Sequence, residues 1–365
     1  MRKTSVDRTL LAVVGAMVTG GMLIFFSASL SLLPRGSELF GGALLSQIVL
    51  GLLGGLLGLW AMLQVPLALL KRFALHAFVA SAVLTACVFL PYIGLSINGA
   101  RRWIDLGFTT FQPSEVLKLG YILGLAYILS RSAKRGKDVK AGIIPFVALT
   151  LGVAVLLLLQ PDTDTLIVIA GAGMAMMFAA GMRYRDIALF ACGAVVLLGL
   201  LVLVRPYLLE RVHTFLDPTR DPQGSGYQIK QSLIAIGSGE VWGRGFGQSI
   251  QKFNYLPEAS SDSIFAVYAE EFGFVGSVLL IVGFLFLVLR GLWVAARSED
   301  YYGSLVVTGI VALIGLQAFF NIAAMTGILP VGGLTLPFAS HGGTSLLMTL
   351  VMLGIVLNVS RTARS

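Results

Sequence analysis

One carboxylate in this chain stands where chemistry could be done. It is Asp262, the last residue of the segment Tyr255–Asp262, which ends a long polar loop and runs directly into an apolar stretch. An ionisable group at a membrane boundary is costly to desolvate, so its presence there suggests a function. The loop is also rich in cations, which suit anionic ligands. We therefore expect Asp262 to act on an anionic, lipid-linked substrate.

A second group of charged residues comes earlier in the chain. Arg101 and Arg102 are adjacent and precede Trp103, an arrangement that suits an interfacial segment in contact with phosphate groups. Glu115 and Lys118 are three residues apart and can form an ion pair across one helical turn. For Glu115 and Lys118 a structural role is favoured over a catalytic one.

Two further carboxylates occupy the tight turn Gln160–Thr165. Asp162 or Asp164 can simply cap the helix that follows. The alternative is that Asp162 helps to hold a divalent cation or orients a cationic neighbour.

The long loop, at about residues 205–262, carries cations of its own, among them Arg211, Arg220 and Lys252. It is too long to be an idle connection. Its glycines allow backbone N–H groups to approach a phosphate closely, although glycine-rich loops are common. These cations either pair with nearby carboxylates or bind another anion, because the charge of the inner leaflet does not hold an outer loop.

The helix that follows Asp262 carries small residues on the same side as that carboxylate. At roughly 100° per residue, four of them lie within about 40° of its direction: Ala266, Ala269, Gly273 and Gly276. They indicate either close packing of a neighbouring segment or an open cavity beneath Asp262. Glu271 points about 180° away, so we expect it to pair elsewhere as a structural residue.

Prolines and glycines interrupt the last predicted hairpin, between Asn321 and Ser345. Irregular backbone at membrane depth is tolerated only where it is buried in protein or lines a wet cavity. We therefore expect this hairpin, including Ser340, Gly342 and Gly343, to line the same site as Asp262.

The elements that position these residues are membrane helices. The chain is 57% hydrophobic and only 12% charged over 365 residues, and repeated apolar runs of about 20 residues are typical of spanning helices. The sequence predicts an all-α polytopic membrane protein with a single domain over residues 1–365. Ten spans are expected: Leu10–Leu33, Phe40–Leu63, Leu75–Ile93, Ser114–Ser130, Gly142–Leu159, Thr165–Gly181, Ile187–Val204, Ser263–Ala295, Gly303–Thr326 and Thr335–Ser360.

The distribution of cations orients these spans. Most Lys and Arg residues fall on the side of the N-terminus, which is the asymmetry expected when both termini are cytoplasmic. The loop at about 205–262, between the seventh and eighth spans, is then extracytoplasmic. The net charge of +8 is spread over inner loops and favours a membrane surface over nucleic acid. Cys87 and Cys192 lie within different spans and show no disulfide or metal spacing.

Together, these segments resemble the SEDS family of polytopic peptidoglycan glycosyltransferases. The resemblance covers nearly the whole chain and rests on six segments in order: Asn98–Asp105, Gln112–Lys118, Gln160–Thr165, Asp217–Gly247, Tyr255–Gly276 and Asn321–Ser345. Residues Gly226–Ala235, Tyr255–Ala259 and Gly333–Pro337 look more like the division branch (FtsW) than the elongation branch (RodA).

The chain departs from the family pattern at three places. Ser260 and Ser261 stand where the family usually has His-Thr, and Ser263 stands in place of Phe. Asp164 replaces a usual Gly, and His341 replaces a usual Tyr. Asp262, between Ser261 and Ser263, is retained.

The resemblance implies polymerisation of lipid II into β-1,4 glycan strands, with Asp262 as the general base that activates the acceptor hydroxyl. It implies cations around the leaving diphosphate and further substrate contacts. These are expected from Arg101, Arg102, Lys118, Arg211, Arg220 and Lys252, and from Glu258, Ser340, Gly342 and Gly343. A divalent ion, Mg²⁺ or Mn²⁺, is implied as well, with Asp262 and Asp162 as candidate ligands.

The resemblance also implies a place in the cell and a set of partners. Members of this family work in the bacterial cytoplasmic membrane, and the division branch acts at the septum with a class B penicillin-binding protein and other division proteins. No nucleic-acid partner is expected. The alternatives are an elongation-type polymerase, a lipid II flippase, which buried polar residues and broken helices would also serve, and a non-catalytic scaffold.

Overall fold

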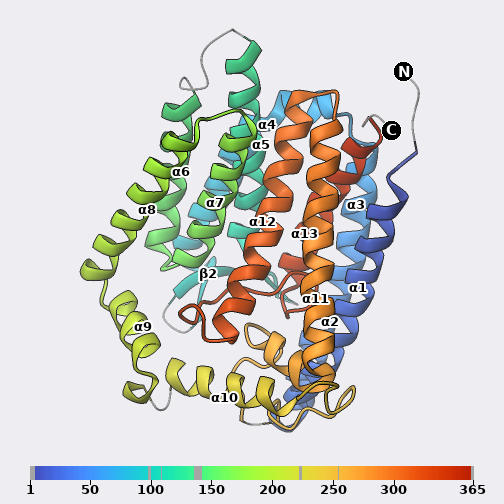
Figure 1. Cartoon of the computed structure of the whole chain (residues 1–365), viewed down its shortest axis with the longest axis vertical. Coiled ribbons are helices and arrows are strands. Elements are labelled where there is room, and N and C mark those ends of the chain that lie inside the picture. The colour runs from blue at the N-terminus through green and yellow to red at the C-terminus, as the bar shows by residue number, and fades with distance from the viewer. Residues whose placement is uncertain are drawn as a thin grey trace.

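The computed structural model describes residues 5–97, 100–107, 109–134, 142–221, 224–253 and 255–362, and these form an elongated bundle of helices (Figure 1). Asn98 and Gly99, which open one of the segments that resemble the SEDS family, lie outside the described residues. Both chain ends lie at one end of the bundle, and α10 lies across the opposite end.

Helices make up most of the described chain. They are α1 (Arg8–Ser29), α2 (Ser37–Leu45), α3 (Gly55–Gln64), α4 (Leu67–Ala86), α5 (Pro113–Lys134), α6 (Ile143–Leu159), α7 (Thr163–Ala179), α8 (Tyr184–Val204), α9 (Pro206–Leu216), α10 (Ser225–Ser238), α11 (Ile264–Arg297), α12 (Tyr301–Met325) and α13 (Gly343–Ser360). Short helical segments join them: η1 (Leu30–Arg35), the π-helical η2 (Ser46–Gly54), η3 (Cys87–Phe89) and η5 (Pro218–Arg220).

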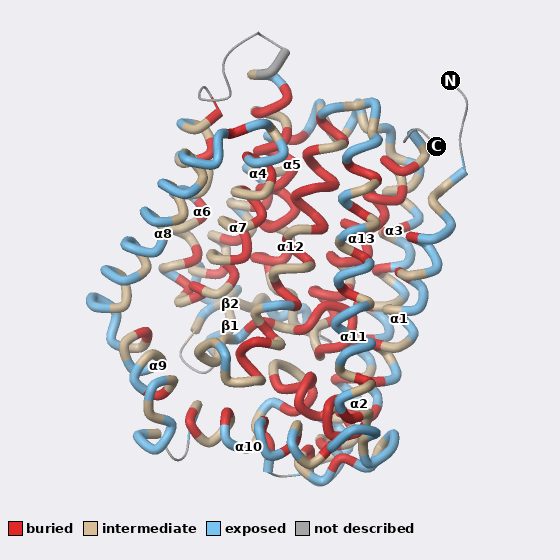
Figure 2. The backbone as a smooth tube through the Cα atoms, in the orientation of Figure 1, coloured by how far each residue is buried: buried red, intermediate tan, exposed pale blue. Residues whose placement is uncertain are grey.

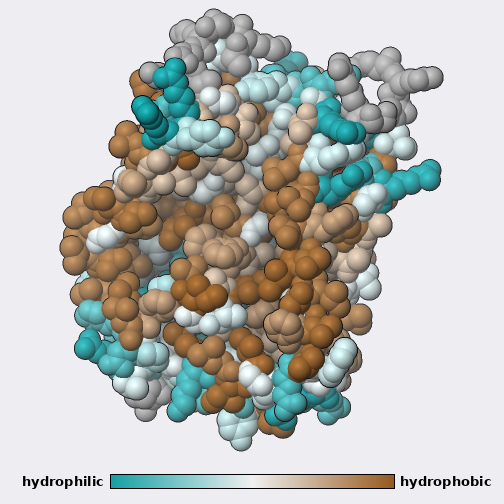
Figure 3. Space-filling view, in the orientation of Figure 1, coloured by the Kyte–Doolittle hydropathy of each residue, from teal (hydrophilic) through white to brown (hydrophobic). Residues whose placement is uncertain are grey.

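Among the described residues, seven helical segments are long and apolar enough to cross a membrane, and α6 and α7 are shorter apolar helices. Figure 3 shows a broad hydrophobic region across the middle of the face in view, with hydrophilic residues toward both ends. Multi-pass membrane insertion agrees with this distribution. The count of ten spans and the side on which each terminus lies stay predictions.

The core is formed by the helices at the centre of the bundle. Residues of α12 and α13 are mostly buried, whereas none in α8 is buried (Figure 2). The helix pairs in closest contact are α4 with α5, α3 with α13, and α12 with α7 and α11. Because hydrocarbon can cover apolar side chains, α8 needs no buried face of its own.

The structure corrects three details of the predicted elements. The all-α prediction misses a small antiparallel sheet, β1 (Gly94–Ile97), β2 (Ala100–Asp105) and β3 (Thr110–Phe111), in the order β1-β2-β3. Helix α4 begins at Leu67, well before the predicted start at Leu75, because aliphatic residues accompany its two cations. The last span is helical only from Gly343, since glycine and proline break the backbone before it.

Helix α11 contains a break that the small-residue pattern did not predict. Gly273 adopts φ 65° and ψ −163° inside the helix. The loop after α10 fills the break with backbone hydrogen bonds. They run from Arg244 N to Glu270 O (3.0 Å), from Gly245 N to Glu271 O (2.9 Å), from Phe274 N to Glu240 O (2.9 Å) and from Val275 N to Val241 O (3.1 Å). The backbone N–H and C=O groups that the break leaves without helical partners therefore form hydrogen bonds with the loop.

The small residues of α11 serve this close packing. A Cβ placed on Gly273 would lie 2.3 Å from Gly243 N, and one on Gly239 would lie 2.1 Å from Ala269 O. Both distances are shorter than any normal contact. The small-residue stripe therefore packs against the loop instead of opening a cavity.

This packing generates a stability prediction. Gly273→Ala should lower the melting temperature of the protein in nanodiscs, because the added methyl group meets loop backbone and the positive φ is strained for alanine. Gly15→Ala in α1 is the matched control, since nothing lies within 4 Å of the added Cβ, and it should leave the melting temperature unchanged or raise it. Equal effects of the two substitutions would contradict the role given to the break.

Candidate active site

A polar cavity of about 430 Å³ surrounds the side chain of Asp262. It is lined from five parts of the chain: the start of η2, the β-sheet, α9, the loop before α11 and the broken hairpin before α13. A larger groove of about 600 Å³ lies between α11 and α12, but its lining includes no titratable side chain. Acid–base chemistry therefore belongs to the smaller, polar cavity.

The broken hairpin holds the backbone on which Asp262 sits. Asn321 Nδ2 donates to the carbonyl of Asp262 (2.8 Å), and Ser340 Oγ donates to the carbonyl of Ser261 (2.7 Å). The backbone N–H of His341 donates to the carbonyl of Ser260 (2.7 Å). Three consecutive carbonyls are thus fixed, so the carboxylate is held in a defined position at the cavity.

The protonation of Asp262 is perturbed by this setting. Its side chain is half-buried, and desolvation raises its pKa from the ordinary 3.8 to about 7. Burial is the largest cause of this shift; the negative charge of Glu258, and more weakly that of Asp164, contributes to it, whereas the hydrogen bond from Ser261 and the charge of Arg102 act in the opposite direction. A carboxyl whose pKa lies near neutrality is suited to take up a proton during a reaction.

Arg102, on β2, is the first cation at the cavity. Its Nε donates to Gln160 O (3.0 Å) and its Nη2 to Pro161 O, while Nη1 lies 3.8 Å from Asp162 Oδ1. The turn before α7 therefore orients the guanidinium. Asp162 is buried, caps α7 through Thr165 N (3.4 Å), and is not among the lining residues. This geometry agrees with the predicted orienting role of Asp162.

Arg211, on α9, is the second cation at the cavity. Its Nη1 donates to Asp164 Oδ2 (3.1 Å). Glu258, Gly342 and Gly343 also line the cavity, as predicted, and Ser340 supports it from behind. Arg102 and Arg211 thus provide positive charge beside the carboxylate, which suits an anionic group of a ligand.

Two predicted substrate cations, Arg101 and Arg220, lie away from the cavity. Arg101 precedes Arg102 on β2 and is exposed, and it does not line the cavity. Arg220 is exposed and pairs with Asp217 at 3.4 Å. The structure therefore does not bring either residue to Asp262.

Lys118 lies beneath the site. It is buried, and its Nζ donates to Glu115 Oε1 (2.7 Å) and to Gln317 Oε1 (2.9 Å). Gln317 Nε2 in turn donates to Thr335 O (2.9 Å) in the hairpin. The ion pair between Glu115 and Lys118 forms as the spacing predicted, and it supports the hairpin without lining the cavity.

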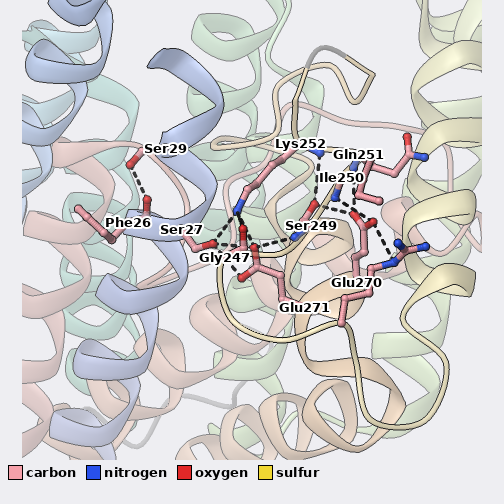
Figure 4. A network of polar contacts seen from close by, with 11 residues as sticks. Phe26, Ser27, Ser29, Gly247, Ser249, Ile250, Gln251, Lys252, Glu270 and Glu271 are labelled. Atoms are coloured by element: carbon pink, nitrogen blue, oxygen red, sulfur yellow. Dashed lines mark hydrogen bonds and ion pairs between the residues drawn. The ribbon is translucent and has the colours of Figure 1, made fainter. Parts of the chain in front are cut away.

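Lys252 was expected to contact substrate, but the structure buries it. Its Nζ donates to Glu271 Oε1 (2.8 Å), Ser27 Oγ (3.0 Å) and Gly247 O (2.9 Å), as Figure 4 shows. The side chains of Lys252 and Glu271 are 0% and 1% exposed. Lys252 therefore anchors the loop between α10 and α11 to α1 and α11, and Glu271 pairs away from Asp262, as its direction on the helix predicted.

Glu270 forms the second half of the same network. It accepts hydrogen bonds from Ser249 Oγ (2.5 Å), Ile250 N (3.1 Å) and Gln251 N (3.2 Å), and Arg244 Nε lies 3.5 Å from its carboxylate. The charge of Glu270 is thus compensated mainly by loop groups. The network fixes the loop that leads to Asp262.

A metal site at Asp262 and Asp162 finds little support in the arrangement of the side chains. Among the residues that the structure describes, no group of three His, Cys, Asp or Glu side chains could hold an ion. Asp162 is engaged as a helix cap next to Arg102. The divalent ion stays a prediction, and we assign no chemical step to it.

Ser46 and Thr110 line the cavity with hydroxyl groups and were not foreseen from the sequence. Thr335 and His341, which also line it, belong to the hairpin that was predicted to do so, and Gln112 opens a segment that resembles the SEDS family. His341 departs from the pattern of that family. Its ring stacks on Phe25 at 5.9 Å, and its Nε2 is buried without a hydrogen-bond partner in the described structure.

The fold and the cavity define a class: helical membrane proteins with a polar acid–base site at one end of the bundle, beside a broken last hairpin. A family model described as "Cell cycle protein", which unites FtsW, RodA and SpoVE, matches residues 7–365. The chain belongs to this family, and the SEDS resemblance seen in the sequence is confirmed.

Relatives and solved structures agree over nearly the whole length. The chain is 37% identical over 366 residues to stage V sporulation protein E of Bacillus subtilis (strain 168), which covers 100% of this chain and 99% of that protein. It is 38% identical over 362 residues to the probable peptidoglycan glycosyltransferase FtsW of Nitrosomonas europaea. That match covers 97% of this chain and 92% of the relative.

Two solved structures share the fold. A chain from the structure described as "Structural coordination of polymerization and crosslinking by a peptidoglycan synthase complex" superposes with a TM-score of 0.78 at 32% identity, covering 98% of each chain. A mutant of the rod shape determining protein RodA of Thermus thermophilus gives a TM-score of 0.71 at 30% identity, covering 99% of each chain.

Because Lys252 is buried in an ion pair with Glu271, its replacement should destabilise the folded protein and not merely weaken ligand binding. Lys252→Met leaves the charge of Glu271 buried and unpaired, which destabilises a protein by about 3–5 kcal/mol. The melting temperature in nanodiscs should fall markedly. It should recover in part in the double variant Lys252→Met/Glu271→Gln, which removes the orphaned charge.

The control is Arg220→Gln, which breaks an exposed ion pair and should leave the melting temperature nearly unchanged. A Lys252→Met protein with the wild-type melting temperature would show that Lys252 is not an anchor.

Proposed function

We propose that this chain is a peptidoglycan glycosyltransferase that polymerises lipid II at the outer face of the cytoplasmic membrane, with Asp262 as the general base. The observation that carries the proposal is the cavity itself. It combines a half-buried carboxyl of raised pKa with the guanidinium groups of Arg102 and Arg211. The family and the names of its relatives support this choice of reaction.

The proposed orientation places the cavity outside and both termini in the cytoplasm. The chain ends lie opposite the end that carries α10, and the asymmetry of Lys and Arg along the sequence favours the cytoplasm for the termini. A substrate anchored in the outer leaflet then meets the cavity at the membrane surface.

In the proposed reaction, Asp262 takes the proton from the 4-hydroxyl of the acceptor sugar. The freed oxygen attacks the anomeric carbon of the donor, and the bond from that carbon to the diphosphate breaks. Undecaprenyl diphosphate leaves with the bonding electrons, and the α-linked donor becomes a β-1,4 linkage. A single displacement with inversion needs one base and no carboxylate nucleophile.

The two arginines are assigned to the leaving diphosphate. Negative charge grows on it as the bond breaks, and oriented cations stabilise such charge most when little water intervenes. Arg102 is held by the turn before α7, and Arg211 is held by Asp164. Both are therefore in place before the substrate arrives.

We infer a role in the division branch, in partnership with a class B penicillin-binding protein. Relatives named FtsW and SpoVE support a role in septal or sporulation wall synthesis. A neighbouring structure described as a peptidoglycan synthase complex that coordinates polymerization and crosslinking supports a transpeptidase partner. Depletion of the protein in its host should block septation if the division role holds and side-wall growth if an elongation role holds.

Replacement of the base tests the reaction directly. Asp262→Asn should lower glycan polymerisation from purified lipid II by about 10²–10⁴-fold, the usual contribution of a general base. Insertion should be retained and the melting temperature should not fall, because the substitution keeps the shape of the side chain. Asp105→Asn, an exposed carboxylate outside the cavity, is the control and should polymerise normally.

The same variants distinguish a flippase. Wild-type protein that moves labelled lipid II between liposome leaflets, and makes no polymer, would overturn the proposal. Polymer made at normal yield by Asp262→Asn would refute the base assignment alone.

The raised pKa of Asp262 predicts a pH dependence. The base acts only when ionised, so kcat/KM should rise about tenfold per pH unit below pH 7 and level off above it. The raised pKa also means that folding favours the neutral carboxyl. Its contribution to stability is full below pH 3.8 and is lost as pH rises through about 7.

Two measurements check these signs. A pH–rate profile should show an acid limb near pH 7, and Asp262→Asn should raise the melting temperature relative to wild type more at pH 8 than at pH 5. A limb at the ordinary pKa of a carboxyl, near 4, would contradict the assigned environment.

A further inference from the structure

One ion pair at the cavity joins three parts of the chain that are far apart in sequence. Asp164, in the first turn of α7, accepts hydrogen bonds at Oδ2 from Arg211 Nη1 and from Gly333 N, both at 3.1 Å. Arg211 belongs to α9 and Gly333 to the broken hairpin. The side chains of Arg211 and Asp164 remain 29% and 18% exposed, so the junction lies at the open side of the site.

Helix α9 needs such a connection. Its described contacts are mainly with α8, η5 and α10, and α8 has no buried residue of its own. The position of α9 relative to the core is therefore weakly determined by apolar packing. The bond from Arg211 to Asp164 ties α9 to α7, a helix that packs on the central α12.

The bond leaves most of Arg211 free for a ligand. A guanidinium has five N–H groups, and the pair with Asp164 uses Nη1 alone. The side chain also lies over the ring of Tyr207, 5.9 Å from its centroid. Arg211 is therefore held at one nitrogen and along one side, while its other donors remain to bind the oxygens of a diphosphate.

The second bond of Asp164 fixes the hairpin beside the catalytic carboxylate. A Cβ placed on Gly333 would lie 3.6 Å from Arg102 Nη1 and 3.9 Å from Asp262 Oδ2, so this backbone borders both groups. A Cβ on Gly332 would lie only 2.9 Å from Cγ of Asp164. The approach of the Asp164 carboxylate thus depends on the absence of a side chain at Gly332.

We propose that Asp164 is a positioning residue for the polymerisation reaction: it holds Arg211 and the Gly333 backbone in place around Asp262, so that a diphosphate-linked donor meets an ordered site. This inference rests on the proposed glycosyltransferase function. It concerns a residue at which the chain departs from the usual glycine of the SEDS family.

The charge of Asp164 gives the proposal a signature that a merely structural residue would lack. The charged groups that act on Asp262 are Glu258, Asp164 and Arg102, and the cavity also contains Arg211 and His341. Asp164 raises the pKa of Asp262. Its neutralisation should therefore shift the acid limb of the pH–rate profile to lower pH, while a merely structural loss would leave the limb in place.

The experiment compares purified full-length variants in nanodiscs with lipid II. Asp164→Asn should raise KM for lipid II roughly 3- to 10-fold, the factor that corresponds to one ordinary hydrogen bond, and should move the acid limb down. Asp164→Glu, which keeps the charge, should restore the limb. Asp217→Asn, which breaks an exposed ion pair in the same outer loop, is the matched control and should change neither readout.

A double-mutant cycle tests whether Asp164 acts through Arg211. In the Arg211→Gln background, Asp164→Asn should raise KM by much less than it does in the wild type, because its partner is already absent. Additive effects, or an unchanged KM and acid limb in Asp164→Asn, would overturn the proposal.

The measurements distinguish an error in the role of Asp164 from an error in the proposed glycosyltransferase function. If wild-type protein polymerises lipid II and Asp262→Asn does not, the function stands whatever Asp164→Asn does. If wild-type protein makes no polymer, binding of undecaprenyl diphosphate to wild type and Asp164→Asn still measures the positioning of Arg211. Equal affinities would then reject the role of Asp164.

Discussion

The structure depends on how irregular backbone is satisfied near a membrane. The hairpin before α13 is irregular and contains only turn-type hydrogen bonds, such as that from Ser340 N to Leu336 O. Ser340 and His341 in this segment, and Asn321 near the end of α12, nevertheless bond to the backbone at Ser260–Asp262. Unpaired backbone groups in such a setting are strongly unfavourable. The mutual bonding is therefore both what permits the break and what places a carboxylate at the cavity.

The cations around the cavity and the loop before α11 divide into two kinds by burial. Lys118 and Lys252 are buried and paired with Glu115 and Glu271. A lone charge there would be unstable, so these pairs constrain how the hairpin and the loop can sit. Arg102 and Arg211 are partly exposed and keep donors free. Lys118 and Lys252 are thus anchors, whereas Arg102 and Arg211 line the cavity with donors available. The sequence indicated this division for Lys118, through its spacing to Glu115, but not for Lys252.

Breaks in regular structure coincide with the functional end of the bundle. The loop at Gly239–Gly245 enters the gap in α11 at Gly273, and the network of Lys252 and Glu271 holds the next part of that loop (Figure 4). The part of the loop that precedes Asp262 is therefore held in place by these bonds. A continuous helix predicted from local sequence is wrong at Gly273, because hydrogen bonds to the loop replace the hydrogen bonds within the helix.

The sequence by itself determined the apolar helices and the pair of Glu115 with Lys118, because hydropathy and spacing along one helix are local properties. It also placed Glu271 on the face away from Asp262. Only the tertiary structure decided that Lys252 is an anchor and that Asp164 meets Arg211 and Gly333. Those partners lie far apart in sequence, and desolvation, which separates a buried ion pair from a ligand site, depends on what the whole fold packs around each charge.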